Sequence, residues 1–225
     1  MTTMKEKPIL FSGPMVRAIL DGRKTQTRRA IKYLPPLGWP LDWCPKWLRD
    51  KVGFAKLAGH PERYCPYGQP GDRLWVRETH RWDGVDPKIA VREKRTDTLT
   101  YRADWDGDRA IDDCPWRPSR FMPRWASRIT LEITDVRVER LQDITEDDAM
   151  AEGLERVALD GLMEMTPLGM RPEIGWMNYS AGGGFNKAAR SFATLWQSIN
   201  GKDSWEQNPW VWVVSFRKLP AKGDS

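Results

Sequence analysis

Apolar residues recur at helical spacing in three segments of the chain, which predicts three helices. The first helix covers residues 14–20 and precedes Gly22, a residue suited to the left-handed turn that ends a helix. The second covers residues 145–153 and starts on a capping-box pattern. The third covers residues 186–201, and its apolar positions are Ala189, Phe192, Leu195, Trp196 and Ile199.

Four segments carry the hydrophobic patterns of β-strands. Apolar residues alternate over residues 73–78 and, more weakly, over residues 98–102. Residues 127–140 alternate on either side of a break in phase at Thr134–Asp135, which predicts a bend or a bulge in a long strand. Residues 211–216 are nearly all apolar, which predicts a buried strand.

Three long stretches without such patterns separate these elements. They cover about residues 33–70, 82–120 and 155–185, and stretches of this length are usually functional or mobile loops. The order of the elements predicts the α+β class, with a partly closed β-barrel flanked by helices. We expect a single domain over residues 1–225, with the three stretches as loop insertions.

Composition narrows the class of protein. Hydrophobic residues make up 40% and charged residues 30%, which is typical of a globular chain. No apolar run approaches the about 18 residues of a membrane helix, and the N-terminus lacks a signal-peptide pattern, so we expect no membrane partner. The net charge of +5 permits an anionic partner. Three cysteines exclude a full disulfide framework and favour a reducing cytoplasm.

The soft metal ligands are few and widely spaced. No close C-x-x-C pair of the kind usual in structural zinc sites is present, so we expect no metal and no other cofactor. Inert buried thiols are the favoured interpretation of the cysteines, although their role stays open. The residues concerned are Cys44, Cys65, Cys114, His60 and His80.

Directly after the first predicted helix, four cations stand beside two hydroxyl groups. Such a cluster can hold a phosphate or polarise a carbonyl group, and its alternative is a solvated basic turn. The residues of this basic cluster are Arg23, Lys24, Thr25, Thr27, Arg28 and Arg29.

A second cluster interleaves arginines with aromatic residues, as proteins that grip single-stranded nucleic acid do. The alternative is that the tryptophans belong to the core and the arginines cap them through cation–π contacts. The candidates in this segment are Trp116, Arg117, Arg124, Trp125 and Arg128, to which Tyr101 and Trp105 can add.

The segment from Gly22 to Arg29, entered from an apolar helix, resembles the signature of the ASCH domain, a member of the PUA-like superfamily. Further segments resemble, in the right order, the family's Gly-Asp turn into a barrel strand, its long strand, the next helix and the closing strand. These are residues 71–76, 128–140, 141–152 and 210–216. The larger pattern, which adds residues 65–68, 116–119, 122–128 and 208–212, resembles an ASCH-like group common in phages and prophages.

PUA-like barrels bind RNA or modified bases, and small bacterial ASCH proteins include amidohydrolases that deacylate N4-acetylcytidine. In those enzymes a Lys, a Thr three residues later and a Glu on the later helix form the site. The resemblance therefore implies Lys24, Thr27 and Glu152 as catalytic residues. Glu78 is a competing candidate for the acid, and the extra cation Arg28 favours a substrate that carries phosphate.

The chemistry of this triad is coherent. A Thr hydroxyl needs a base to become a nucleophile, and a Lys can serve when desolvation and neighbouring cations lower its pKa. Glu152 can orient the Lys or protonate the leaving amine. Residues three apart on an ideal strand point to opposite faces, so Lys24 and Thr27 converge only if the chain turns or bulges after Gly22.

The favoured function is metal-independent hydrolysis of an amide on a modified base of the N4-acylcytidine type, with a nucleoside or RNA as partner. One alternative is an RNA or modified-base binding module without turnover. Another is a ribonuclease that places Lys24 and Arg28 on the scissile phosphate, although neither His lies near this motif in the sequence. The oligomeric state stays open.

Overall fold

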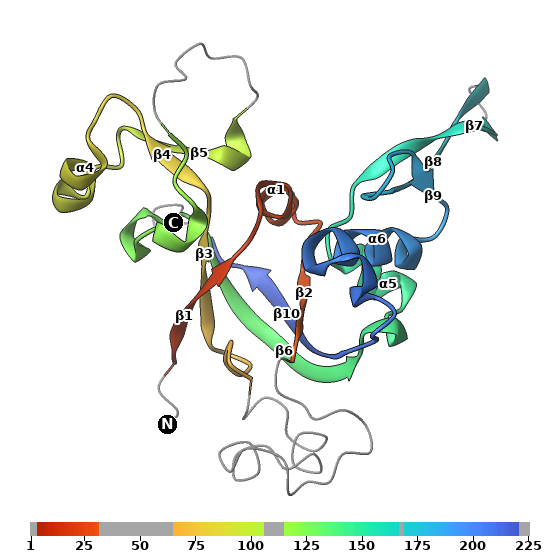
Figure 1. The fold of residues 1–225 in the computed structure, drawn as a ribbon, viewed down its shortest axis with the longest axis horizontal. Coiled ribbons are helices and arrows are strands. Elements are labelled where there is room, and N and C mark those ends of the chain that lie inside the picture. Colours follow the sequence, from red (N-terminus) through yellow and green to blue (C-terminus); the bar gives the residue numbers. More distant parts are fainter. Residues whose placement is uncertain (1–3, 32–64, 106–114, 167–168, 221–225) are drawn as a thin grey trace, which may run out of the picture. The chain divides into compact units, whose positions relative to one another are not determined.

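The computed structural model describes residues 4–31, 65–105, 115–166 and 169–220 (Figure 1). The chain forms two compact units, which we describe separately. Unit 1 comprises residues 1–22, 66–134 and 216–225, and unit 2 comprises residues 23–65 and 135–215. The single domain expected over the whole chain stays a prediction.

Five strands form one mixed sheet in the order β1-β3-β6-β10-β2. β1 runs parallel to β3, whereas β3 pairs antiparallel with β6, and β2 antiparallel with β10. This mixture of helices and strands confirms the α+β class. Among the described residues the outer strands β1 and β2 do not pair, so the sheet is not a closed barrel. The strands are β1 (Glu6–Leu10), β2 (Gln26–Ala30), β3 (Arg73–Arg77), β6 (Thr130–Arg140) and β10 (Trp210–Lys218).

Two of these strands pass from one unit to the other. β6 begins in unit 1 and ends in unit 2, and β10 runs the opposite way. Within β6, Ile133 and Val136 are buried while Thr134 and Asp135 between them are exposed. Two buried residues three positions apart break the two-residue period of a strand, which confirms the change of phase expected from the sequence.

Unit 1 packs helix α1 (Gly13–Leu20) with apolar residues of its strands. Val16, Ile19, Leu74 and Val76 are all fully buried or nearly so. Gly22 has a φ of 75°, the left-handed conformation that stops the helix and turns the chain toward β2. The stop predicted at this glycine is therefore confirmed.

The stretch 82–120 of unit 1 contains more regular structure than its sequence pattern predicts. β4 (His80–Trp82) pairs antiparallel with β5 (Leu99–Tyr101), and helix α4 (Pro87–Glu93) lies between them in the chain. The weak strand expected at residues 98–102 is confirmed. Short 3-10 turns lie at Arg102–Asp104, Ser119–Phe121 and Arg124–Ala126 in this unit, and at Leu141–Asp143 and Lys202–Ser204 in unit 2.

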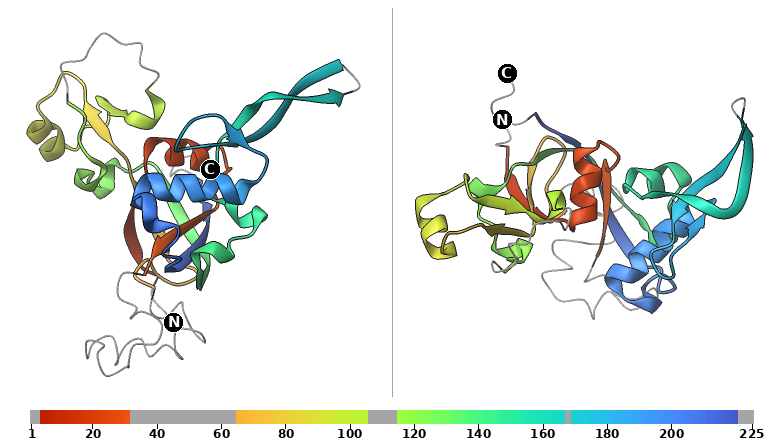
Figure 2. Two further views of the ribbon diagram at one scale, coloured as in Figure 1. Left: turned by 45° about the vertical axis from the view of Figure 1, so that its right-hand side comes forward. Right: turned by 90° about the horizontal axis from the view of Figure 1, so that it is seen from above.

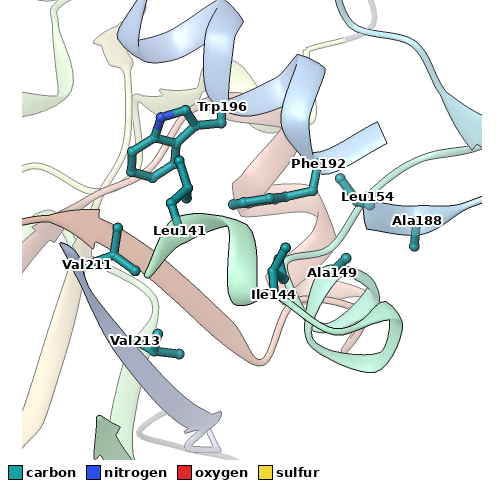
Figure 3. Packing of buried hydrophobic residues seen from close by; sticks show 9 residues of the cluster. All are labelled: Leu141, Ile144, Ala149, Leu154, Ala188, Phe192, Trp196, Val211 and Val213. Carbon is teal, nitrogen blue, oxygen red and sulfur yellow. The ribbon is translucent and has the colours of Figure 1, made fainter. Parts of the chain in front are cut away.

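Unit 2 has its own hydrophobic core, drawn in Figure 3. Helix α5 (Glu146–Ala151) and helix α6 (Ala188–Asn200) contribute its side chains together with the start of β10. Thr145 accepts a hydrogen bond from the Asp148 amide, and Gly201 ends α6, as the sequence predicts. The core residues are Leu141, Ile144, Ala149, Leu154, Ala188, Phe192, Trp196, Val211 and Val213.

The expected loop at residues 155–185 is instead a small antiparallel sheet. It consists of β7 (Arg156–Thr166), β8 (Gly169–Met177) and β9 (Gly184–Phe185), and its long hairpin is seen in Figure 2. Gly175 and Gly184 allow Leu159 to pack against the backbone, since a Cβ at these positions would lie 2.5 Å and 2.6 Å from its side chain. Bulky apolar residues at these two positions would have made the strand pattern visible in the sequence, whereas glycines do not.

The insertion predicted at residues 33–70 lies mostly outside the described residues, which include only residues 65–70 of it. No helix in the described ranges has the length and apolar character that crossing a membrane requires.

Candidate functional site

Lys24 and Glu152 come together in unit 2 through the backbone. The Thr25 amide donates to the Ala151 carbonyl oxygen at 2.9 Å, and Lys24 and Glu152 form an isolated antiparallel bridge. Glu152 is the residue that ends α5, and Gly153 follows it with a φ of 79°. The end of α5 is thereby fixed beside the chain that enters β2.

The side chains of this pair meet in a buried position. Lys24 Nζ donates to Glu152 Oε2 and to the Glu152 carbonyl oxygen, both at 2.8 Å. The side chain of Lys24 is 0% exposed and that of Glu152 is 4% exposed. Desolvation lowers the pKa of Lys24 below its ordinary value, while the charge and hydrogen bond of Glu152 oppose this shift. Arg28 and Arg29 lower the Lys24 pKa further.

Arg28 binds the other oxygen of the same carboxylate. Its Nη1 lies 3.3 Å from Glu152 Oε1 and 2.6 Å from Gln26 Oε1, and the guanidinium carbon lies 5.7 Å from the ring centre of Phe192. Its Nη2 donates to Glu139 at 2.5 Å and to Asp148 at 3.0 Å. This arginine therefore contacts three carboxylates while its side chain is fully buried.

Arg137 adds further ion pairs to this network. Arg137 donates to Asp148 Oδ2 at 2.7 Å and to Glu139 Oε2 at 3.2 Å. Burial alone would raise the pKa of Asp148, but Arg137, together with Arg28 and Gln26, holds that pKa below its ordinary value. Lys24, Arg28 and Arg137 thus pair with Glu139, Asp148 and Glu152, and Arg137 also lies 3.7 Å from Asp135. Of these residues, the sequence singles out only Lys24, Arg28 and Glu152 as candidates for the site.

The missed members left a weak signal in the sequence. Arg137 and Glu139 are two residues apart at the end of β6, so both point to the same face of that strand. Asp148 stands three residues after Thr145 in the predicted capping box, which gives no sign that its carboxylate faces Gln26, Arg28 and Arg137. The positions of charged residues along the chain do not show which ones a fold will pair.

Thr27 lies on a different face of β2 from the charged network. Gln26 and Arg28 hydrogen bond to each other across one face, so the residue between them points to the opposite face. Thr27 is buried and stands opposite Val214 in the register of β2 and β10. The structure therefore brings two members of the predicted triad into contact and places the third across the strand.

The other members of the basic cluster take separate positions. Arg23 donates to the carbonyl oxygens of Gly153 and Leu154, both at 3.2 Å, which ties it to the end of α5. Thr25 is exposed, and Arg29 is half-buried opposite Trp212 in the strand register.

Glu78, the competing acid, belongs to unit 1. Its carboxylate is 1% exposed and is paired with Arg128 at 2.9 Å. Burial raises the pKa of Glu78, and Arg128 opposes that shift. Arg128 also binds Asp104 at 2.6 Å and lies over the Tyr101 ring at 4.0 Å. Desolvation is the main cause that raises the pKa of Tyr101 to about 12.

In unit 1, the arginines and tryptophans of the second cluster contact other residues of the same unit. Arg124 pairs with Glu6 at 2.6 Å. The Trp116 ring lies 4.6 Å from the guanidinium of Arg81 and 5.1 Å from that of Arg102, and Arg117 lies 5.5 Å from the Trp82 ring. The Trp125 ring packs 6.3 Å from that of Trp82. The contacts of Trp116 and Arg117 are of the cation–π kind that the alternative interpretation expects, and the nucleic-acid partner stays a prediction.

No group of three or more metal-binding side chains occurs within the part of the chain that the structure describes. Cys65 is buried and His80 is fully buried, with its Nδ1 at 3.0 Å from the Glu78 carbonyl oxygen. Cys44, His60 and Cys114 lie outside the described residues.

Comparison of the chain with models of protein families, with curated proteins and with solved structures found no match in any of the three.

Proposed function

We propose that this protein hydrolyses an amide on a modified nucleobase of the N4-acylcytidine type, on a fold of the ASCH and PUA-like kind. The observation that carries the proposal is the buried contact between Lys24 Nζ and Glu152 Oε2 at 2.8 Å. A lysine with a lowered pKa is present in its neutral form more often at neutral pH, and a neutral amine can accept a proton.

The proposed reaction assigns a role to each member of the triad. The Thr27 hydroxyl attacks the acyl carbon, and its proton passes to Lys24 through a water molecule, because the two side chains lie on different faces of the chain at β2. The amine of the base leaves with a proton supplied through the Lys24–Glu152 pair, and an ester on Thr27 remains. Water then hydrolyses this ester, which releases the carboxylic acid and restores the hydroxyl.

The position of Thr27 sets a condition on substrate binding. β2 is the last strand in the sheet order, and the end of α5 is bridged to the chain just before it, so among the described residues no strand pairs with its outer edge beyond this bridge. A planar base that lies along this edge can reach side chains from both faces of the strand. The acyl group would then stand between Thr27 and the buried pair.

The charge balance favours an uncharged substrate. Lys24 and Arg28 already contact carboxylates, and a phosphate bound to either would have to displace Glu152 or its neighbours. Displacing a paired carboxylate from a buried cation is costly. This supports a nucleoside as substrate over a phosphate of an RNA chain, and it weakens the ribonuclease alternative.

The test is incubation of the protein with N4-acetylcytidine, followed by ultraviolet absorbance and by identification of cytidine and acetate. We expect turnover by the wild type and by Lys187→Met, which removes an exposed lysine. We expect none by Lys24→Met, since the methionine keeps the apolar stem and loses the amine. Absence of cytidine in the wild-type reaction would overturn the proposal.

A further inference from the structure

Arg28 is held too tightly to serve as an open ligand for phosphate. Its fully buried guanidinium is bound on one side by Glu152 and Gln26 and on the other by Glu139 and Asp148. The last two carboxylates are only 18% and 21% exposed. The arginine has carboxylates on both ends of its fork, and one of them belongs to the proposed active site.

The Glu152 carboxylate is shared between two cations. Oε2 binds Lys24 at 2.8 Å, and Oε1 lies 3.3 Å from Arg28. If the carboxyl group rotated, it would lose one of these contacts, so Arg28 restricts the orientation in which Glu152 meets Lys24. A planar guanidinium can bridge carboxylates in this way, whereas an ammonium is a single point of charge.

We infer that Arg28 is a positioning residue, which holds the Glu152 carboxylate against Lys24 and is itself anchored by Glu139 and Asp148. This inference rests on the proposed function for its kinetic test, and it assigns to Arg28 a task other than the phosphate binding expected from the sequence. Arg28 acts through Glu152 and does not touch the reacting atoms.

Arg137 provides a matched control. It contacts the same two outer carboxylates, at 2.7 Å for Asp148 and 3.2 Å for Glu139, and it makes no ion pair with Glu152 among the described residues. Arg28→Lys and Arg137→Lys both keep the charge and remove the fork. Only the first of them disturbs Glu152.

The first readout is steady-state turnover of N4-acetylcytidine. We expect Arg28→Lys to lower kcat about tenfold or more with KM nearly unchanged, because the loss affects the transition state and not ground-state binding. We expect Arg137→Lys to keep kcat within about threefold of the wild type. Equal kcat in Arg28→Lys and the wild type would overturn the inference and leave the proposed function standing.

The second readout does not require turnover. The Lys24 ammonium can be titrated by NMR in protein labelled at lysine Nζ. The charge at position 28 is kept in Arg28→Lys, so a looser Glu152 should let the Lys24 titration move to lower pH, and Arg137→Lys should leave it in place. An unchanged titration in Arg28→Lys overturns the inference even if the wild type proves inactive on N4-acetylcytidine.

A third variant covers failure of Arg28→Lys to fold. Glu139→Gln removes the charge of one of the two carboxylates that anchor Arg28 Nη2, leaves Asp148 in place, and touches neither Lys24 nor Glu152 among the described contacts. We expect a smaller change of the same sign in kcat and in the Lys24 titration. If kcat and the Lys24 titration of Glu139→Gln both equalled those of the wild type, the anchoring role of Glu139 would be contradicted.

Discussion

Lys24 Nζ binds Glu152 twice, through the side-chain oxygen Oε2 and through the backbone carbonyl oxygen, each at 2.8 Å. The carbonyl belongs to the residue at the end of α5, where the negative end of a helix favours a cation. The ammonium group of Lys24 thus stabilises the end of α5 and at the same time contacts the Glu152 carboxylate. The contact makes the pair a structural element of unit 2 as well as a candidate for proton transfer.

Substitutions that remove or restore the Thr27 hydroxyl distinguish a covalent mechanism, in which Thr27 attacks the substrate, from direct attack by water. We expect Thr27→Val to lower turnover of N4-acetylcytidine at least about 100-fold, since valine has the same shape without the nucleophile. Thr27→Ser should keep measurable turnover because it restores the hydroxyl. The measurement is kcat for both variants. Full activity in Thr27→Val would assign the attack to water and leave Thr27 as a buried residue of β2.

Asp148 should stabilise the folded protein through its charge. Its pKa in the folded state is lowered, so this stability is present above the unfolded value near pH 4 and is lost as the pH falls through the folded value. We expect Asp148→Asn to cost roughly 1–2 kcal/mol at pH 7, discounted for partial exposure, and less at lower pH. Denaturant unfolding at several pH values measures this.

Asp147→Asn is the control for that change, because Asp147 is exposed and lies in the same first turn of α5. It removes the same interaction with the helix dipole without touching Arg28 or Arg137. An equal loss of stability in both variants would mean that the network around Asp148 contributes nothing beyond the helix end.

Arg128 should matter to the stability of unit 1 more than to binding of nucleic acid. Arg128→Met leaves the Glu78 carboxylate buried without its partner, which we expect to cost about 3 kcal/mol at pH 7. The loss should grow as the pH rises, because burial raises the pKa of Glu78 and protonation relieves the unpaired charge. Thermal or denaturant unfolding checks both points.

Arg124→Met serves for comparison, since Arg124 and its partner Glu6 are 40% and 36% exposed. A surface pair of this kind is worth about 0–1 kcal/mol. If instead both arginine variants unfolded like the wild type but bound single-stranded RNA more weakly, the RNA-binding alternative of the sequence would be favoured.

Hydrophobic periodicity predicted several of the elements whose side chains face a core, but it did not predict the short strands β1 and β4. The helix at residues 14–20 and the strand at residues 211–216 were predicted because burial leaves apolar residues in a fixed phase. β2 was not predicted, because its buried residues Gln26, Thr27 and Arg28 are all polar, and a polar network satisfies Gln26 and Arg28 instead of an apolar core. The hairpin of β7 and β8 was missed because glycines replace bulky residues where its strands pack closely.

The site was predictable only as far as residue types and motif spacing reach. Lys24 and Glu152 are 128 positions apart, and the resemblance to a known family is what joined them. Spacing alone already indicated that Thr27 faces away from Lys24 on an ideal strand, and the alternation of β2 agrees. The carboxylates of Glu139 and Asp148 could not be assigned to Arg28, since pairing depends on how β6 and α5 approach β2 in space.

In the proposed amide hydrolysis, Lys24 and Glu152 together move the proton. The most direct measurement is kcat/KM for N4-acetylcytidine across pH in the wild type and in Glu152→Gln. The charge of Glu152 raises the Lys24 pKa, so its removal should lower that pKa, move the acid limb of the profile to lower pH and reduce the maximum rate. A Glu152→Gln profile that coincides with the wild-type profile, or a wild type without turnover at any pH, would contradict the account.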